Sequence, residues 1–142
     1  MEIVETLKSA GIIPVIVIED EAKAVPLANA LVAGGLPVLE VTFRTKAAAG
    51  AIAKIKAEVP GAIVGAGTLL TKEQVKAAKE AGAVFGVAPG FDPVIVAYAQ
   101  EIGLPMVPGI ADSIIVVLSL CHPTTFCVNM LRQAFKSAAG KA

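Results

Sequence analysis

Polar and apolar residues alternate along residues 36–45. Glu40, Thr42 and Arg44 occupy every second position between apolar neighbours. A period of two predicts a β-strand with one apolar face and one polar face. Because residues i, i+2 and i+4 of a strand point to the same side, we expect the carboxylate, the hydroxyl and the guanidinium to project together as a candidate site. The same alternation is typical of a half-exposed strand whose polar face meets water, and this stretch alone leaves both interpretations open.

The first 110 residues repeat one unit, a short apolar run followed by a segment with helical spacing. Besides 36–45, we expect strands at 12–18, 62–68, 83–88 and 105–110. We expect helices at 2–10, 21–33, 46–58, 71–81 and 92–102. The strands begin at intervals of about 21–25 residues, and such regular alternation predicts a parallel sheet with right-handed crossovers.

Local signals support several of these boundaries. The run 12–18 is apolar and β-branched, which predicts a buried strand. Thr71 and Gln74 have the spacing of a capping box at a helix start. Asp92 can cap the next helix, with Pro93 at its first position. In parallel folds the site lies at the carboxyl ends of the strands. Those ends hold small or polar residues at 40–44, 65–68, 88–90 and 108–109.

The final third of the chain departs from this pattern. Residues 112–120 contain a solid apolar block at 114–118, and periodicity alone assigns it neither to a buried helix nor to a strand. Pro123 ends the block, 124–128 can form a sixth strand, and 129–137 a last helix. About six parallel βα units cannot close the usual eight strands, so we predict an α/β fold that is an incomplete TIM (β/α) barrel. A flat, flavodoxin-like sheet is the alternative.

Composition narrows the class of protein. The chain has 142 residues, enough for one domain with its own core, and it is 56% hydrophobic and 17% charged, which argues against disorder. Twelve basic and twelve acidic residues without a basic run argue against a nucleic-acid partner. Two cysteines form no disulfide framework, so a cytoplasmic setting is the default. No signal peptide opens the chain, and prolines and Asp112 interrupt its most membrane-like window, 102–121.

Six short stretches resemble bacterial 2-keto-3-deoxy-6-phosphogluconate (KDPG) aldolases, of the KDPG/4-hydroxy-2-oxoglutarate aldolase family. They are Ile13–Val17, Ala30–Gly35, Val38–Thr45, Ile63–Thr68, Val87–Gly90 and Met106–Ile110. Their order and spacing match the family over residues 2–111, with a weak match at 124–136. The single domain 1–142 thus divides into an aldolase-like part, 1–111, and a divergent part, 112–142.

The resemblance implies an activity and a set of site residues. The family is a trimeric (β/α)8 barrel that needs no metal or cofactor and releases pyruvate and glyceraldehyde 3-phosphate through a lysine Schiff base. By resemblance, Glu40 is the general acid/base, Arg44 holds the carboxylate of a pyruvate-like keto acid, and Thr68 and Pro89 form part of the site wall. The residue types suit these roles: a carboxylate can move protons beside a Schiff base, and a guanidinium binds a carboxylate bidentately.

The resemblance fails at the residue on which the family's chemistry depends. The family's lysine lies on the sixth strand, before a Phe-Pro-Ala-Glu context. Here residues 124–126 are followed by Cys127, which falls where the lysine would be, and the motif after it is missing. The glycine-rich phosphate loop and strands seven and eight are also absent from the sequence. We therefore expect a truncated, rearranged or engineered aldolase whose activity is lost or very weak.

Other candidate sites are weaker. Residues 65–67 start like a dinucleotide fingerprint, but Leu70 stands where its third glycine would fall. Cys121, His122 and Cys127 give three metal ligands without a fourth, so we predict no metal site. A thiol nucleophile at Cys127 would need a base, and His122 is the one nearby candidate.

Two functions remain open at this stage. The first is a lyase of the KDPG aldolase type, and the second is a non-catalytic aldolase-derived scaffold or self-assembling oligomer. The second follows from the open edges expected at 12–18 and 124–128 and from the apolar block 114–118, which must be covered. A symmetric homo-oligomer would provide that cover, and Val116→Glu should then break it.

Overall fold

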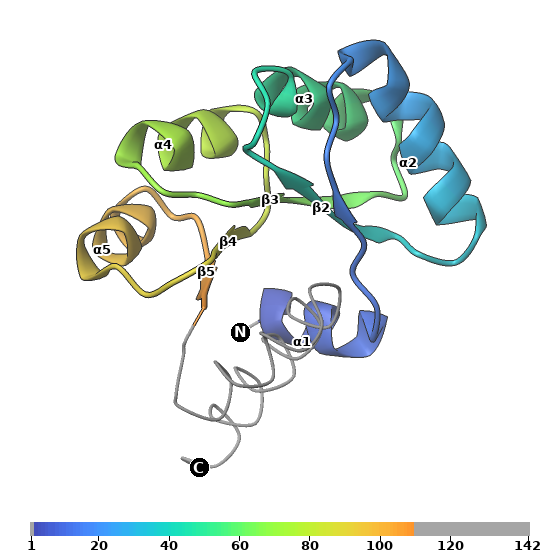
Figure 1. The fold of residues 1–142 in the computed structure, drawn as a ribbon. Helices are drawn as coiled ribbons and strands as arrows, with labels where there is room; N and C mark the ends of the chain where they lie inside the picture. The colour runs from blue at the N-terminus through green and yellow to red at the C-terminus, as the bar shows by residue number, and fades with distance from the viewer. Residues whose placement is uncertain (1, 110–142) are drawn as a thin grey trace, which may run out of the picture.

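The computed structural model describes residues 2–109, which fold into a parallel sheet flanked by helices (Figure 1). The strands are β1 (Val15–Ile16), β2 (Val38–Thr42), β3 (Ile63–Gly67), β4 (Gly86–Ala88) and β5 (Met106–Pro108). The helices are α1 (Glu2–Ala10), the 3₁₀ helix η1 (Glu21–Lys23), α2 (Ala24–Ala33), α3 (Ala48–Glu58), α4 (Lys72–Glu80) and α5 (Pro93–Glu101). The predicted sixth strand, the last helix and the apolar block 114–118 lie outside the described residues.

The order of the strands decides between the two predicted architectures. The sheet runs β1-β2-β3-β4-β5, and each neighbouring pair is parallel. A flavodoxin-like sheet would place its second strand at the edge, before the first. Consecutive order is that of a (β/α) barrel, so the α/β, incomplete-barrel prediction is confirmed over the described strands and the flavodoxin-like alternative is wrong.

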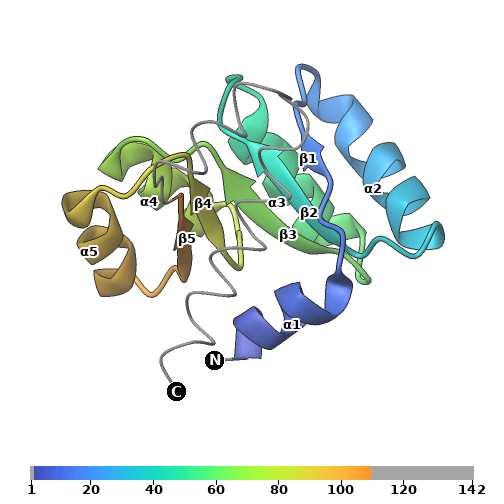
Figure 2. The same ribbon diagram turned by 60° about the horizontal axis from the view of Figure 1, so that its bottom comes forward.

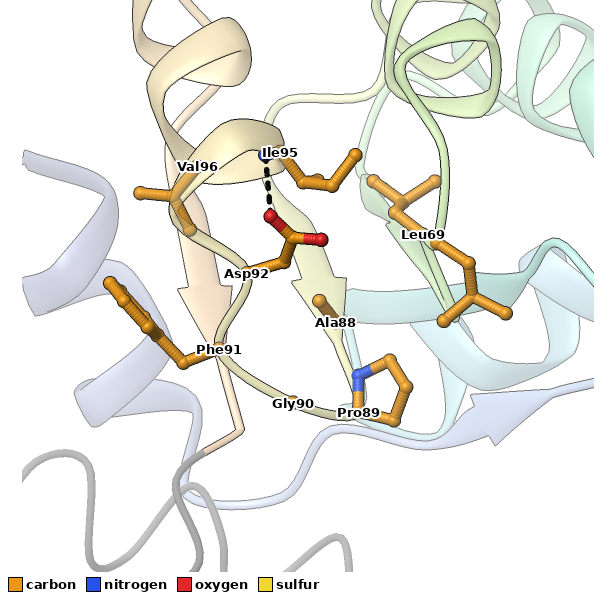
Figure 3. Close-up of a pocket in the computed structure, with 9 residues that line it drawn as sticks. Leu69, Ala88, Pro89, Gly90, Phe91, Asp92, Ile95 and Val96 are labelled. Carbon is orange, nitrogen blue, oxygen red and sulfur yellow. Dashed lines mark hydrogen bonds between the residues drawn. The ribbon is translucent and has the colours of Figure 1, made fainter.

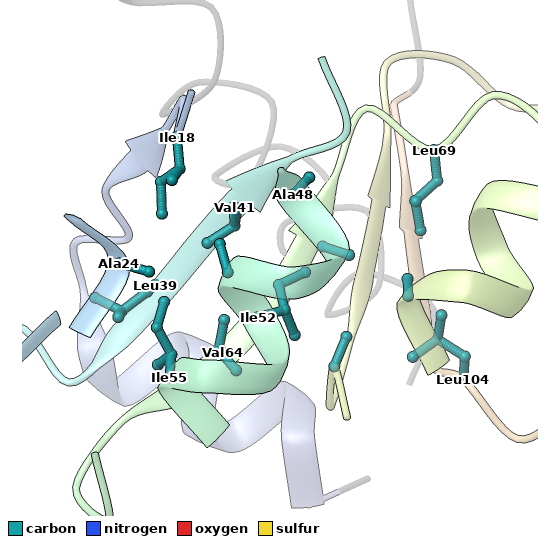
Figure 4. Packing of buried hydrophobic residues seen from close by; sticks show 14 of the residues in the cluster. Ile18, Ala24, Leu39, Val41, Ala48, Ile52, Ile55, Val64, Leu69 and Leu104 are labelled. Atoms are coloured by element: carbon teal, nitrogen blue, oxygen red, sulfur yellow. The ribbon is translucent and has the colours of Figure 1, made fainter. Parts of the chain in front are cut away.

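Apolar residues pack on both faces of the sheet. The cluster between the sheet and α2–α5 includes Leu39 and Val41 from β2 and Ile52 and Ile55 from α3, all nearly inaccessible to solvent (Figure 4). A smaller cluster on the opposite face joins Leu7 of α1 to side chains of β2 and β4. Figures 1 and 2 place α1 on the side of the sheet away from α3. The middle of the sheet is therefore covered on both faces, as parallel strands require.

The start of α4 follows its predicted signal in part. Thr71 is the N-cap, and its hydroxyl accepts a hydrogen bond from the backbone N–H of Gln74 at 3.3 Å. In a complete capping box the Gln74 side chain would bond back to the N-cap residue. Here Gln74 Oε1 accepts instead from the backbone N–H of Leu70 at 2.7 Å. The glutamine thereby ties the loop after β3 to the helix that follows it.

The first predicted strand is the clearest error of the sequence analysis. β1 contains two residues, and among the described strands it pairs with β2 alone. Ile12 is 63% exposed and Val17 is 49% exposed, whereas Ile18 is buried in the cluster under the helices. The run 12–18 is therefore not a buried strand. It lies at the edge of the described sheet. Its apolar side chains are buried on the face toward the helices and exposed on the opposite face.

Candidate functional site

The polar residues of β2 are buried, contrary to the interpretation of a half-exposed strand. Glu40 is 3% exposed and Thr42 is fully buried. Arg44 does not lie on the strand, which ends at Thr42, but in the turn that follows, where it is exposed. The expectation that all three project from one strand face is therefore wrong for Arg44. The register pairs Thr42 with Gly67, the last residue of β3, so β2 loses its partner strand at that point.

Thr42 serves the structure of the sheet. Its hydroxyl donates to the backbone carbonyl of Ile16 at 3.1 Å, and Thr45 Oγ1 donates to the carbonyl of Ile18 at 2.5 Å. Both bonds tie the carboxyl end of β2 to the segment that contains β1. A buried hydroxyl with a partner of this kind leaves no polar group unsatisfied. Of the two polar residues on β2, Thr42 therefore stabilises the sheet through its hydrogen bond to Ile16. Among the hydrogen bonds between described residues, none of this kind involves Glu40.

Glu40 has the most perturbed acidity of the described residues. Burial raises its pKa from 4.5 to about 7, and the positive charge of Arg44 opposes this rise. None of the hydrogen bonds between described residues reaches its carboxyl group, and none of their ion pairs joins it to Arg44. Desolvation disfavours the charged form of a carboxyl group. A carboxyl with a pKa near 7 can both give and take a proton at neutral pH, as a general acid/base must.

Thr68 follows β3 with a backbone φ of +60°. A β-branched residue at positive φ is strained, because its side chain crowds the backbone in this region. The strained turn leads into Leu69, whose backbone N–H donates to the carbonyl of Val87 at 3.1 Å. Thr68 itself is half-buried at the edge where β2 and β3 end. Strain of this kind is found where a chain must take a particular path, often beside a functional site.

Pro89 lines an apolar pocket of about 300 Å³ (Figure 3). Its walls come from the end of β4, the loop after it, the first turn of α5 and the loop after β3: Leu69, Leu70, Ala88, Pro89, Gly90, Phe91, Asp92, Ile95 and Val96. The Asp92 carboxylate faces the helix, as predicted, and accepts from the N–H groups of Val94 and Ile95 at 2.8 and 3.3 Å. This pocket therefore offers little free polar chemistry.

Three of the predicted site residues come from three neighbouring strands of the sheet or from the positions just after them. In a parallel sheet all carboxyl ends meet at one edge, and here Glu40, Thr68 and Pro89 come from β2, from just after β3 and from just after β4. Neighbouring strands lie about 4.8 Å apart and a strand rises about 3.3 Å per residue. By the register, Pro89 lies two strands away from Glu40 and about four residues further toward the carboxyl ends, so the two residues are roughly 16 Å apart. Of these residues, Pro89 lines the apolar pocket described above.

Gly67 was not predicted as a site residue, although it lies in the strand end 65–68 and in the family-like stretch Ile63–Thr68. The signal was present, because Gly65 and Gly67 alternate on β3 as Glu40 and Thr42 do on β2. The register pairs Glu40 with Gly65 and Thr42 with Gly67. Two glycines therefore lie across from the two polar residues, on the same face of the sheet.

Metal and membrane sites can be judged only over residues 2–109. Within that range no group of three or more His, Cys, Asp or Glu residues is placed to hold a metal ion. No helix in the same range is long and apolar enough to cross a membrane. Cys121, His122 and Cys127, the candidate ligands of the sequence analysis, lie outside it, as does the position expected for the family's lysine.

Comparison with known proteins identifies one family. Residues 3–126 match the family model described as KDPG and KHG aldolase. The 2-dehydro-3-deoxy-phosphogluconate aldolase of Treponema pallidum is 50% identical over 111 residues, which is 78% of this chain and 53% of that protein. The KHG/KDPG aldolase of Escherichia coli is 49% identical over 105 residues, 74% of this chain and 49% of that protein.

Solved structures agree with these relatives. The 2-keto-3-deoxy-6-phosphogluconate aldolase of Zymomonas mobilis, solved with 3-phosphoglycerate, superposes with a TM-score of 0.69 at 47% identity, covering 80% of this chain and 56% of that one. The KDPG aldolase of Legionella pneumophila, solved with pyruvate captured as a covalent carbinolamine, has a TM-score of 0.67 at 40% identity, covering 76% and 52%. The chain spans about half the length of the curated relatives that it matches.

Proposed function

Because this chain belongs to the KDPG and KHG aldolase family, we propose that it carries the keto-acid-binding and proton-transfer part of such an aldolase site, with aldol cleavage lost or very weak. The observation that carries the proposal is Glu40, a buried residue in the middle of β2 whose carboxyl has a pKa of about 7. The ligand we propose is a pyruvate-like 2-keto acid.

The two charged residues at this edge take different roles in the proposal. Arg44 follows β2 and is exposed, so its guanidinium is free to receive the ligand's carboxylate through two parallel hydrogen bonds. Glu40 is buried and half protonated near pH 7, so it exchanges a proton with the carbon next to the keto group. Thr68 and Pro89 bound the same edge and complete the proposed wall.

Cleavage of a carbon–carbon bond needs more than these groups. The family's reaction passes through a lysine Schiff base, and in this sequence Cys127 stands where that lysine would be. An amine is needed to convert the keto group into an iminium that accepts electrons from the breaking bond. A thiol adds to a carbonyl but leaves no such acceptor. We therefore propose binding and slow proton exchange without efficient cleavage.

Borohydride trapping with pyruvate tests the proposal. We expect no covalent adduct by mass spectrometry, whereas pyruvate should bind in a ligand-observed NMR titration. Arg44→Gln should lose most of this binding, because it removes the bidentate partner of the carboxylate. Lys46→Gln, which removes an exposed cation from the same turn, is the matched control and should bind as the wild type does. A borohydride adduct on any lysine would contradict the proposal, and so would pyruvate binding that is unchanged in Arg44→Gln.

A second function, a non-catalytic scaffold that self-assembles, is favoured by one observation. Ile12, Val15 and Val17 are 63%, 38% and 49% exposed along the β1 edge. Apolar side chains beside an open strand edge suit pairing with another copy of the chain. We propose a homo-oligomer, by family habit a trimer, and on composition a cytoplasmic single domain over residues 1–142. Light scattering at micromolar concentration tests assembly, and a monomer would contradict it.

A further inference from the structure

The space occupied by the Glu40 carboxyl group is the space where a side chain at position 67 would begin. A Cβ built on Gly67 would overlap Glu40 Oε1 and would lie 2.7 Å from Cδ and 2.9 Å from Cγ. These three are the nearest atoms that it would meet. Heavy atoms outside a bond do not approach so closely, so the carboxyl could not stay there if residue 67 had a side chain.

The backbone gives no other reason for a glycine at this position. Among the described residues, the glycines with positive φ are Gly11, Gly35, Gly82 and Gly103. Gly67 is not one of them, and it ends a regular strand that an alanine could also end. The left-handed conformation falls on the next residue, Thr68, which is not a glycine. Close approach of the carboxyl is thus the contact that a side chain at position 67 would change, by displacing the end of the Glu40 side chain.

We propose that Gly67 is the positioning residue for Glu40: its missing side chain leaves the place in which the carboxyl group lies, against the backbone at the end of β3. This inference rests on the proposed function in giving Glu40 the acid/base role. The placement itself is a property of the protein without ligand.

The placement has a chemical consequence. With its carboxyl against the β3 backbone, Glu40 is 3% exposed as a residue, and none of the hydrogen bonds between described residues reaches it. A side chain at position 67 would push it outward, toward water and the exposed Arg44. Hydration and a nearby positive charge both favour the carboxylate. Gly67 therefore keeps Glu40 in the environment that makes it a useful acid at neutral pH.

Gly65 provides a matched control on the same face of the same strand. A Cβ at Gly65 would overlap the ring of Phe85, and all three of its nearest atoms belong to that ring. Gly65 also has no positive φ. Gly65→Ala and Gly67→Ala are thus the same chemical change two residues apart. The first would displace the Phe85 ring and the second the Glu40 carboxyl.

The test is an NMR titration of side-chain ¹³C-labelled glutamates in the full chain, with Glu40 assigned by its loss in Glu40→Gln. We expect Gly67→Ala to lower the pKa of Glu40 by about one unit or more, since the group gains water. Gly65→Ala should leave it near the wild-type value. An unchanged pKa in Gly67→Ala, or an equal shift in Gly65→Ala, would overturn the proposal. No pyruvate is present, so failure to bind keto acids leaves this result untouched.

A double-mutant cycle keeps the proposal falsifiable where Gly67→Ala folds poorly. In the wild-type background Gly67→Ala should lower the urea midpoint of unfolding, because the new methyl group meets the carboxyl. In the Glu40→Ala background that loss should disappear, since the clashing atoms are gone. Gly65→Ala should lower the midpoint by the same amount in both backgrounds. An equal loss for Gly67→Ala in both backgrounds would overturn the proposal.

Discussion

β2 and β1 are neighbouring strands whose side chains differ in solvent exposure in a way that their polarity does not predict. On β2 the charged Glu40 is 3% exposed, whereas the apolar Val17, just beyond β1, is 49% exposed. β2 is hydrogen-bonded on both sides, to β1 and to β3. α3 packs over the face of Leu39 and Val41 (Figure 4), whereas Glu40 lies on the opposite face, with Val38 of the smaller cluster. β1 has a described partner on one side alone. Pairing and cover decide burial here, and the polarity of the residue does not.

The contrast explains why the candidate site lies where it does. A carboxyl can be kept out of water only where the fold covers both faces of its strand, and burial then raises its pKa. Within residues 2–109 no strand pairs with the second side of β1, and Val15 and Val17 are exposed, so these side chains remain available for contacts with other molecules. β2 is therefore suited to hold an acid/base residue, and the β1 edge is suited to contact another protein chain.

The largest effect should come from the buried face of β2. Leu39 is fully buried under α3, so Leu39→Ala should lower the free energy of unfolding by about 2–5 kcal/mol through lost burial and a cavity. Val17→Ala at the β1 edge is the matched change and should alter it by less than about 0.5 kcal/mol. Urea unfolding of both variants measures the difference. Equal losses would show that the two strands are not covered differently.

The next effect concerns the buried charge. Because folding raises the pKa of Glu40 from 4.5 to about 7, the folded state binds more protons between these values. Stability should therefore be highest below pH 4.5 as far as this group is concerned, and should fall by about 3 kcal/mol as the pH rises through 7.

Glu40→Gln removes this dependence, because an amide does not titrate. Relative to the wild type, the variant should gain about 2.5 kcal/mol in the free energy of unfolding between about pH 5 and pH 8. Glu58→Gln, at the exposed end of α3, should keep the wild-type pH dependence. Unfolding curves at the two pH values measure the gain. Parallel pH dependence in the wild type and Glu40→Gln would refute burial of the charge.

A smaller change in the free energy of unfolding is expected at the β1 edge of the described sheet. Val17→Lys places a charge on an exposed position, so the free energy of unfolding should change by less than about 0.5 kcal/mol. The mass measured by light scattering should nevertheless fall toward that of a monomer, because a lysine at a strand edge opposes pairing. Val94→Lys, on α5 and 57% exposed, should not change the mass. If the wild type and Val17→Lys have the same mass, β1 does not take part in the interface.

The smallest effect is that of Arg44. Its charge opposes the rise in the pKa of Glu40, so Arg44→Gln should raise that pKa further. The change should be modest, because Arg44 is exposed and water screens its charge. Lys46→Gln is again the control. An NMR titration in which the pKa falls on removal of Arg44 would mean that the arginine acts in another way.

Local signals allowed much of the fold to be predicted. Thr71 and Asp92 begin helices where their side chains can cap backbone N–H groups. The spacing of apolar runs placed the described strands and their parallel order. These features depend on residues a few positions apart, which a single sequence displays directly.

The errors concern features that distant residues decide. Periodicity put Arg44 on the strand, but β2 ends at Thr42, opposite the last residue of β3. The apolar, β-branched composition of 12–18 predicted a buried strand, although burial there depends on a neighbour on its second side. Glu40 could be picked out as a candidate by alternation and by resemblance. Its burial, and the glycine that makes room for it, follow from the register between β2 and β3.

The central claim is that β2 holds Glu40 as a buried acid with a pKa near neutrality, and a ¹³C NMR titration of this one carboxyl in the wild-type chain tests it most directly. The structure predicts a midpoint of about 7, with burial as the cause and Arg44 opposing it. A midpoint near 4.5, the value of an ordinary glutamate, would show that the carboxyl lies in water, and would contradict both the site and its proposed role.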